Sequence, residues 1–281
     1  MPTIEPESRF YTSQRLKLHY AVWGDESKPP LVLVHGTRDH ARSWDGVAQA
    51  LLDRYCVYAP DLRGHGDSDW PAGGQYSLPD FMPEFVLDMA GLVEVIGRAP
   101  LTLIGHSLGG GVALHYAGVY PERVEKVVSI ELLGPPPMPG RAGYERILTW
   151  VDHVQKAERR APRRYPSVEA ATARMLEENP RLAAETAQHL ALHGTRANED
   201  GSYSWKFDPF LRVFSPREFR IEDAREIWYR IRCPVLLIRG TERGADQETT
   251  TAEQRACFKT TAGRSSKARA IGSTTTIPRR S

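Results

Sequence analysis

Short apolar runs alternate with longer amphipathic stretches along the first half of the chain. Residues 15–24, RLKLHYAVWG, alternate with a period of two, which is typical of a strand with one buried face. Four continuous apolar runs follow, in residues 29–36, 55–66, 101–107 and 124–134. Runs of this kind, closed by glycine or polar residues, predict strands buried on both faces of a parallel sheet.

Helices are predicted between these strands. In residues 78–97 the apolar positions Phe81, Phe85, Met89, Leu92 and Ile96 form a helical stripe that ends at Gly97. Residues 109–124, GGGVALHYAGVYPERV, predict a second helix that stops before Pro121. Such β/α alternation predicts an α/β fold, a doubly wound and mostly parallel sheet with helices on both faces.

The character of the chain changes after residue 134. The stretch GPPPMPG allows neither a helix nor a central strand and predicts a boundary. We therefore expect a first part of the core in residues 1–135 and an inserted helical cap in residues 136–225. The core would resume in residues 226–242, which contain the last recognisable strand, RCPVLLIRG. Residues 243–281 form an aberrant tail that we expect to be disordered.

Composition narrows the class of protein. The 281 residues are 41% hydrophobic, enough for a sizeable core, and 37 Lys and Arg nearly balance 35 Asp and Glu. This balance predicts neither a nucleic-acid partner nor an anionic membrane partner. We expect a cytoplasmic protein, since no apolar leader or membrane-length run is visible. Cys56, Cys233 and Cys257 are widely spaced and predict free thiols rather than a disulfide or a metal site.

The candidate chemistry begins at GHSLG, Gly105 to Gly109, which matches the pattern G-x-S-x-G. An apolar strand precedes Ser107 and a glycine-rich helix start follows it. A serine on such a tight turn needs small neighbours, because the backbone is strained and other parts of the chain approach it closely. This context predicts that Ser107 is a nucleophile.

Three stretches together resemble the α/β-hydrolase fold family: Leu31 to Asp45, Tyr58 to Pro71 and Leu103 to Val124. SIELLGPPP and RIRCPVLLIRGTE are similar to the serine hydrolase-like proteins within it, and the resemblance covers roughly residues 10–242. It implies an oxyanion hole formed by the backbone N–H groups of Thr37 and Leu108. It also implies that His35 braces the loop carrying Thr37 and that His65 orders a turn.

The acid of a catalytic triad follows the serine in this family, and the histidine comes last. Asp246, a few residues past the strand in VLLIRGTERGADQE, is the candidate acid. Glu242 beside it and Glu131, at the end of VVSIE, are the alternatives.

A catalytic histidine is missing from the chain. The last histidine is His193, and after Ile238 the large apolar residues are only Phe258, Ile271 and Ile277, from which the expected last strand and helix cannot be built. Back-translating Lys267 to Thr276 with GC-rich codons and starting at the third base gives Gly-Ala-Gly-His-Trp-Leu-His-His-Asp. The family's histidine loop commonly reads Gly-x-Gly-His. We therefore infer a frame shift between Thr241 and Lys267, with the histidine encoded across the codons of Ala270 and Ile271.

The expected function is hydrolysis of carboxylic esters or related acyl compounds, with a small-molecule substrate and no metal or organic cofactor. The first alternative is an inactive remnant or binding protein, because the base is absent. A weaker alternative is C–C bond hydrolysis or cofactor-free haloperoxidation. Trp205, Phe207 and Phe210 could line an acyl site, although a role in the core of the cap is favoured. The sequence favours no particular oligomeric state.

Overall fold

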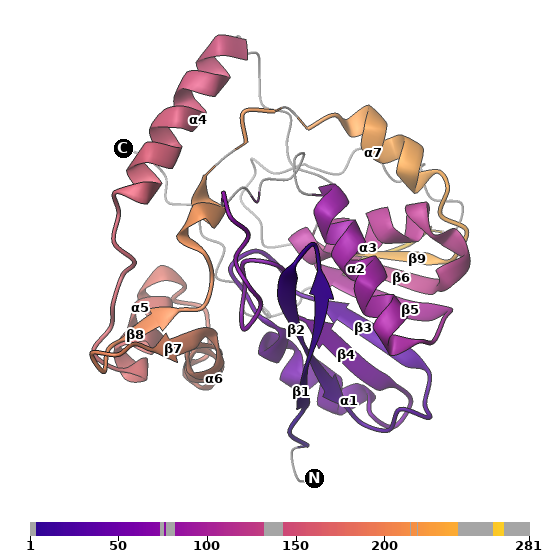
Figure 1. Cartoon of the computed structure of the whole chain (residues 1–281). Helices are drawn as coiled ribbons and strands as arrows, with labels where there is room; N and C mark the ends of the chain where they lie inside the picture. The colour runs from indigo at the N-terminus through magenta and orange to yellow at the C-terminus, as the bar shows by residue number, and fades with distance from the viewer. Residues whose placement is uncertain are drawn as a thin grey trace.

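A central sheet of eight strands organises the molecule (Figure 1). The computed structural model describes residues 4–73, 76, 82–131, 143–213, 215–217 and 219–240, and the backbone of 261–266. The strand order is β1-β2-β4-β3-β5-β6-β9-β10. These strands are β1 Glu7–Ser13, β2 Leu16–Trp23, β3 Pro30–Val34, β4 Cys56–Pro60, β5 Leu101–His106, β6 Val124–Ile130, β9 Val235–Gly240 and β10 Thr261–Ser266.

The sheet is antiparallel at one side and parallel elsewhere. β2 pairs antiparallel with β1 and with β4, whereas the remaining neighbours are all parallel. The carboxyl ends of parallel strands meet at one edge of a sheet. The loops after β3, β5, β6 and β9 therefore leave the sheet at the same edge.

Helices cover both faces of the sheet, and the side chains of β3 show why. Leu31 and Leu33 pack in one apolar cluster with Trp44 and Ala48, whereas Val32 and Val34 pack in the other with residues of α2, α3 and α7. Continuous apolar sequence is thus the signature of a strand with two buried faces. The helices of the core are η1 Ala41–Trp44, α1 Asp45–Leu51, α2 Met82–Ile96, α3 Leu108–Val119, η2 Pro121–Arg123 and α7 Ile221–Trp228.

A helical segment lies beside the sheet, at the left of Figure 1. It has its own small apolar clusters, which contain Met175, Leu182, Ala187 and Leu190 and, next to them, Tyr165 and Ala191. Its elements are α4 Gly143–Glu158, α5 Val168–Glu178, α6 Ala184–Gly194, β7 Thr195–Ala197, β8 Tyr203–Trp205 and η3 Pro209–Arg212.

The predicted doubly wound, mostly parallel sheet is confirmed. The helices α4 to α6 follow β6 in the chain, and α7 packs its Ala224 and Trp228 in the core cluster, so the predicted boundary at residue 225 falls inside a helix that packs on the core. The role of the insertion as a cap stays a prediction. No described helix is both long and apolar enough to span a membrane. Cys56 and Cys233 are free thiols, and Cys257 lies outside the described residues.

Two strands of the central sheet were not predicted, and neither were β7 and β8 of the helical segment. β1 carries the mixed sequence ESRFYTS and is defined by its hairpin with β2. The expectation that no strand could follow residue 242 is wrong for Thr261–Ser266, which pair in parallel with β9. β1 and β10 lie at the two edges of the central sheet, where backbone pairing on one side can define a strand without an apolar run. The rest of the tail lies outside the described residues.

Candidate active site

Ser107 occupies a sharp turn between β5 and α3. Its backbone has φ 51° and ψ −119°, a left-handed φ that non-glycine residues rarely adopt. The Ser107 N–H donates to the Ile130 carbonyl at 2.8 Å, and the Ser107 carbonyl accepts from the Gly110 N–H at 2.9 Å. These bonds hold the strained residue in place, and its half-buried side chain has no hydrogen-bond partner among the described residues.

Two glycines make this turn possible. A Cβ at Gly105 would lie 2.1 Å from the Gly109 carbonyl oxygen, and a Cβ at Gly109 would lie 2.2 Å from the Val34 carbonyl oxygen. Since those oxygens belong to the backbone, they cannot move aside as a flexible side chain would. The pattern G-x-S-x-G therefore reflects close backbone contact between β3, β5 and the start of α3.

Gly109→Ala is expected to destabilise the protein by about 3 kcal/mol or more, because the new methyl group overlaps the backbone of β3. Gly46→Ala in α1 is the matched control, since a Cβ there meets no atom within 4 Å. It should stay within about 1 kcal/mol of the wild type. Urea unfolding of both variants measures the difference, and equal stabilities would contradict the proposed overlap.

The loop after β3 runs alongside Ser107. A Cβ at Gly36 would lie 3.2 Å from Ser107 Cβ and 3.0 Å from His106 Nδ1, so the backbone leading to Thr37 passes next to the serine. The Leu108 N–H is at the start of α3, where amides have no partner within the helix. The Thr37 N–H likewise has no acceptor among the described residues. The close contact between Gly36 and Ser107 was not predicted. The only sequence feature that pointed to it was the glycine at the end of the apolar run in residues 29–36.

His35 is fully buried behind this loop and braces it, as the sequence predicted. Its Nε2 accepts a hydrogen bond from the Leu62 N–H at 3.0 Å, so the proton resides on Nδ1, which donates to the Gly36 carbonyl at 2.7 Å. Burial lowers the pKa of His35 to about 3, and the nearby His65 acts in the same direction. A neutral imidazole with both nitrogens engaged is unsuited to serve as a catalytic base.

A buried polar network supports the loop after β4. Asp61 accepts hydrogen bonds from His19 Nδ1 at 2.7 Å and from the backbone N–H of Ala41 at 2.6 Å. Arg63 makes a two-pronged ion pair with Asp88 of α2, with both N–O distances 2.6 Å. His65 donates from Nδ1 to the Arg63 carbonyl at 2.9 Å, which agrees with the expected turn-ordering role.

Of the three candidate acids, the structure describes only Glu131. Glu131 follows β6 with φ 65°, and its carboxylate accepts a hydrogen bond from the Gly240 N–H at the end of β9. The side chain thus joins two strand ends at the same edge as Ser107. Asp246 and Glu242 lie outside the described residues, so their roles stay predictions.

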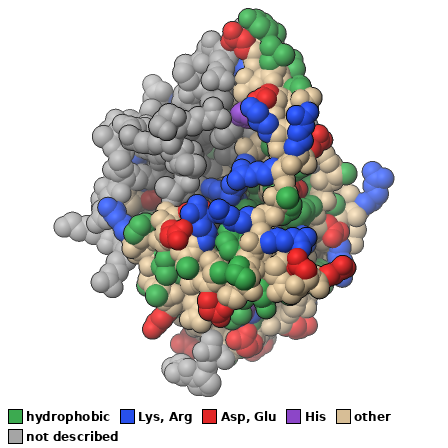
Figure 2. All heavy atoms as spheres, turned by 90° about the vertical axis from the view of Figure 1, so that its left-hand side faces the viewer, with side chains coloured by type: hydrophobic (Ala, Val, Ile, Leu, Met, Phe, Trp, Pro, Cys, Tyr) green, Lys and Arg blue, Asp and Glu red, His purple; other side chains and the backbone are tan. Residues whose placement is uncertain are grey.

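The structure shows what surrounds Trp205, one of the aromatic residues that could line an acyl site. Trp205 packs with Met175 and Leu190 in the apolar clusters of the helical segment and stacks on Phe207, with ring centroids 6.0 Å apart. This contact favours the core interpretation for Trp205. Figure 2 shows the side of the molecule that lies at the left of Figure 1. There Lys and Arg side chains gather near the middle, with Asp and Glu side chains among and around them.

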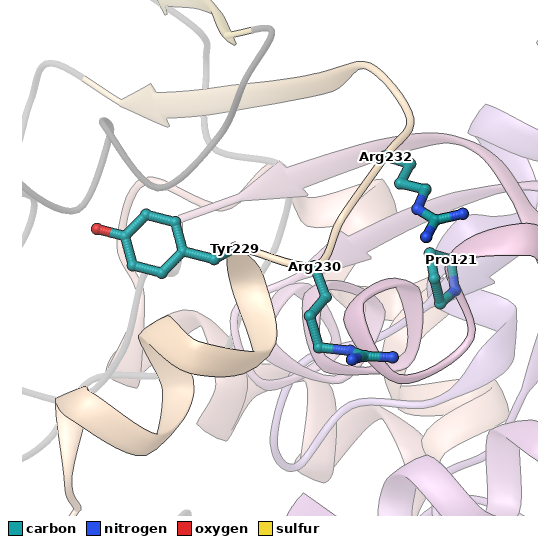
Figure 3. A pocket seen from close by; sticks show the side chains of 4 residues that line it. All are labelled: Pro121, Tyr229, Arg230 and Arg232. Atoms are coloured by element: carbon teal, nitrogen blue, oxygen red, sulfur yellow. The ribbon is translucent and has the colours of Figure 1, made fainter.

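A depression on another part of the surface is not at Ser107. It is lined by Pro121, Tyr229, Arg230 and Arg232, where the chain enters β6 and β9, at the edge of the sheet opposite to the serine (Figure 3). Arg230 donates to the Gly118 carbonyl at 3.2 Å, and Arg232 pairs with Glu122. Both guanidinium groups are thus already engaged by the protein.

Comparisons with known proteins agree with this fold. The family model described as alpha/beta hydrolase fold matches residues 29–242. Lipase LipV of Mycobacterium tuberculosis is 32% identical over 196 residues, 68% of this chain and 67% of the relative. The serine hydrolase-like protein of Mus musculus is 27% identical over 234 residues, 79% of this chain and 72% of its own. An uncharacterized protein of Mycobacterium tuberculosis is 35% identical over 129 residues, and there the match spans only 36% of the relative.

Solved structures show the same fold. The thioesterase domain from the curacin biosynthetic pathway superposes with a TM-score of 0.80 at 23% identity, covering 93% of each chain. A hypothetical protein from Pseudomonas aeruginosa PAO1 gives a TM-score of 0.77 at 24% identity, covering 94% of this chain and 91% of that one. At these identities the likeness shows the architecture alone.

Proposed function

Because this chain belongs to the alpha/beta hydrolase fold family, we propose that it is built as a serine hydrolase acting on carboxylic esters or related acyl compounds. The observation that carries the proposal is the strained turn at Ser107, with the backbone of Gly36 and Thr37 beside it. This arrangement supports the proposal, because Ser107 lies next to the backbone N–H groups of Thr37 and Leu108, which have no acceptor among the described residues. The names of the relatives, a lipase and a serine hydrolase-like protein, agree with acyl chemistry.

The reaction would run in two acyl-transfer steps. Ser107 Oγ attacks the ester carbonyl as its proton passes to a base, and the carbonyl oxygen becomes an oxyanion facing the N–H groups of Thr37 and Leu108. The C–O bond to the leaving alcohol then breaks, and the alcohol takes the proton from the base. Water repeats the sequence on the acyl-enzyme and releases the carboxylic acid.

The base is the part of this scheme that we propose the chain lacks. β10 occupies the far edge of the sheet beside β9 and ends at Ser266. The family's histidine loop comes late in the chain, and the re-read codons place Gly-Ala-Gly-His within a few residues after that strand. We therefore propose that the frame shift removed the base, and that Asp246, its in-frame equivalent or Glu131 would orient it.

A catalytically inactive remnant or binding protein is the second candidate for the chain as it stands. Its support is that His35 is neutral and doubly hydrogen-bonded, and that the side chain of Ser107 has no hydrogen-bonded base among the described residues. C–C bond hydrolysis and cofactor-free haloperoxidation are weaker candidates, and a substrate panel would separate them from esterase activity.

Rapid mixing with a short-chain p-nitrophenyl ester tests the nucleophile. A stoichiometric burst of nitrophenol in this chain, abolished in Ser107→Ala, would support an active serine hydrolase. Thr37→Ala should keep the burst, because the proposed donor is the backbone N–H rather than the hydroxyl. The absence of a burst in the unmodified chain would support the inactive remnant, and a burst surviving in Ser107→Ala would contradict Ser107 as the nucleophile.

A further inference from the structure

Two histidines and a carboxylate meet where the helical segment contacts the core. His189 and His193 lie one turn apart on α6, with ring centroids 4.6 Å apart, and Asp45 is the first residue of α1. One nitrogen or oxygen of each side chain lies within 4.8 Å of the others. We call Asp45, His189 and His193 the α1–α6 cluster. Asp45 is buried and both imidazoles are half-buried, so the cluster is open to solvent on one side.

The distances within the α1–α6 cluster suit a metal ion. His189 Nε2 lies 3.3 Å from Asp45 Oδ2. Tetrahedral zinc with bonds of about 2.0–2.1 Å separates neighbouring ligand atoms by about 3.3–3.4 Å, which matches this pair. The His193 ligand nitrogen lies within 4.8 Å of the other two ligand atoms. Rotation of this side chain, one helical turn from His189, can bring it closer to them.

His189 Nε2 also faces a third group, the Arg42 carbonyl oxygen, at 3.0 Å. A neutral imidazole can direct a single N–H toward only one of two such oxygens. A cation held between Nε2 and these oxygens would interact favourably with all of them. The hydrogen bond to Asp45 raises the pKa of His189.

The charge around the α1–α6 cluster permits a cation although Arg42 is close. Arg42 Nε lies 2.9 Å from both Asp45 oxygens, and Arg42 Nη2 lies 2.7 Å from Asp45 Oδ2 and 2.8 Å from the Glu5 carboxylate. One guanidinium therefore faces two carboxylates, which leaves one net negative charge when the imidazoles are neutral. Arg42 can remain on Oδ1 and orient the carboxylate, as hydrogen-bonding groups behind metal ligands do.

We propose that Asp45, His189 and His193 bind one divalent transition-metal ion, Zn²⁺ by the chemistry of the ligands, which links α1 of the core to α6 of the helical segment. Imidazole nitrogens favour Zn²⁺ over Mg²⁺ and Ca²⁺. Water would fill the remaining position on the open side. This site is separate from the proposed ester chemistry and does not depend on a catalytic histidine.

A second group that could hold a metal, His19 with Asp61 and Asp67, does not support the same conclusion. The Asp61 oxygens already accept hydrogen bonds from His19, from the Ala41 N–H and from the Asp67 N–H at 2.9 Å. The network is complete without an ion.

Calorimetric titration of the full chain with ZnCl₂, after removal of metal with a chelator, tests the proposal. We expect one zinc per chain, with affinity reduced at least about tenfold in His193→Gln and in Asp45→Asn. His153→Gln on α4 is the matched control and should bind as the wild type does. All variants keep the same cysteines, so any thiol site contributes equally to each titration.

Cobalt gives a second measurement that does not require a variant to fold. Co²⁺ bound by two imidazoles and a carboxylate should give visible d–d bands without a thiolate charge-transfer band. Zinc binding that is equal in His193→Gln and His153→Gln, a cobalt spectrum dominated by thiolate, or no saturable binding by the wild type would each overturn the proposal.

Discussion

Correcting the reading frame between Thr241 and Lys267 is expected to raise kcat for a p-nitrophenyl ester by roughly 10⁶-fold over the present chain. The proposed nucleophile turn and oxyanion loop lie among the described residues, and we propose that the frame shift removed the base. Removing the histidine of a serine-protease triad costs a factor of this order, because an unassisted hydroxyl is a weak nucleophile at neutral pH. The measurement is steady-state hydrolysis by the two chains under identical conditions.

Two controls belong to this comparison. In the frame-corrected chain, Ser107→Ala and replacement of the restored histidine by alanine should each return the rate to that of the present chain. Removing both should cost no more than removing one, since the members of a triad act as a unit. Equal activity of the corrected and present chains would show that the re-read histidine is not the base.

Arg63→Met is expected to lower the free energy of unfolding by about 3–5 kcal/mol, because it leaves the Asp88 carboxylate buried without its partner. Both side chains are only 3% exposed. The double variant Arg63→Met with Asp88→Leu is the matched control, and it should recover most of the loss. An apolar pair of similar volume often equals or exceeds a buried ion pair in stability.

Urea unfolding of the single and double variants measures this coupling. If the double variant were as unstable as Arg63→Met, the loss would come from packing around residue 63 rather than from an unpaired charge. The ion pair joins the loop after β4 to α2, so the same substitution should also loosen the turn ordered by His65.

The core strands could be predicted from the sequence because parallel strands buried on both faces require uninterrupted apolar runs. β3 and β5 show this directly, and the glycine and serine positions at their ends were visible as motifs. β1 and β10 could not be predicted in this way, since each is an edge strand defined by hydrogen bonds to its one neighbour.

The polar contacts were harder to predict than the strands. Arg63 and Asp88 are 25 residues apart, and their pairing depends on how α2 crosses the sheet. His189 and His193 carried a local signal, their spacing of four residues on a helix, but Asp45 comes from a distant part of the chain. Residues that meet only through the fold leave no periodic trace in the sequence.

The two-sided burial of β3 also bears on how the protein folds. A strand with one apolar face resists a slip of one residue, because the slip would expose that face to water. β3 has leucines on one face and valines on the other, so such a slip would exchange apolar side chains for apolar side chains. The free-energy cost of the slip would therefore arise at the end of the strand, where Gly36 lies against Ser107. A kinetically trapped, misregistered chain would thus be compact while its nucleophile turn was disrupted.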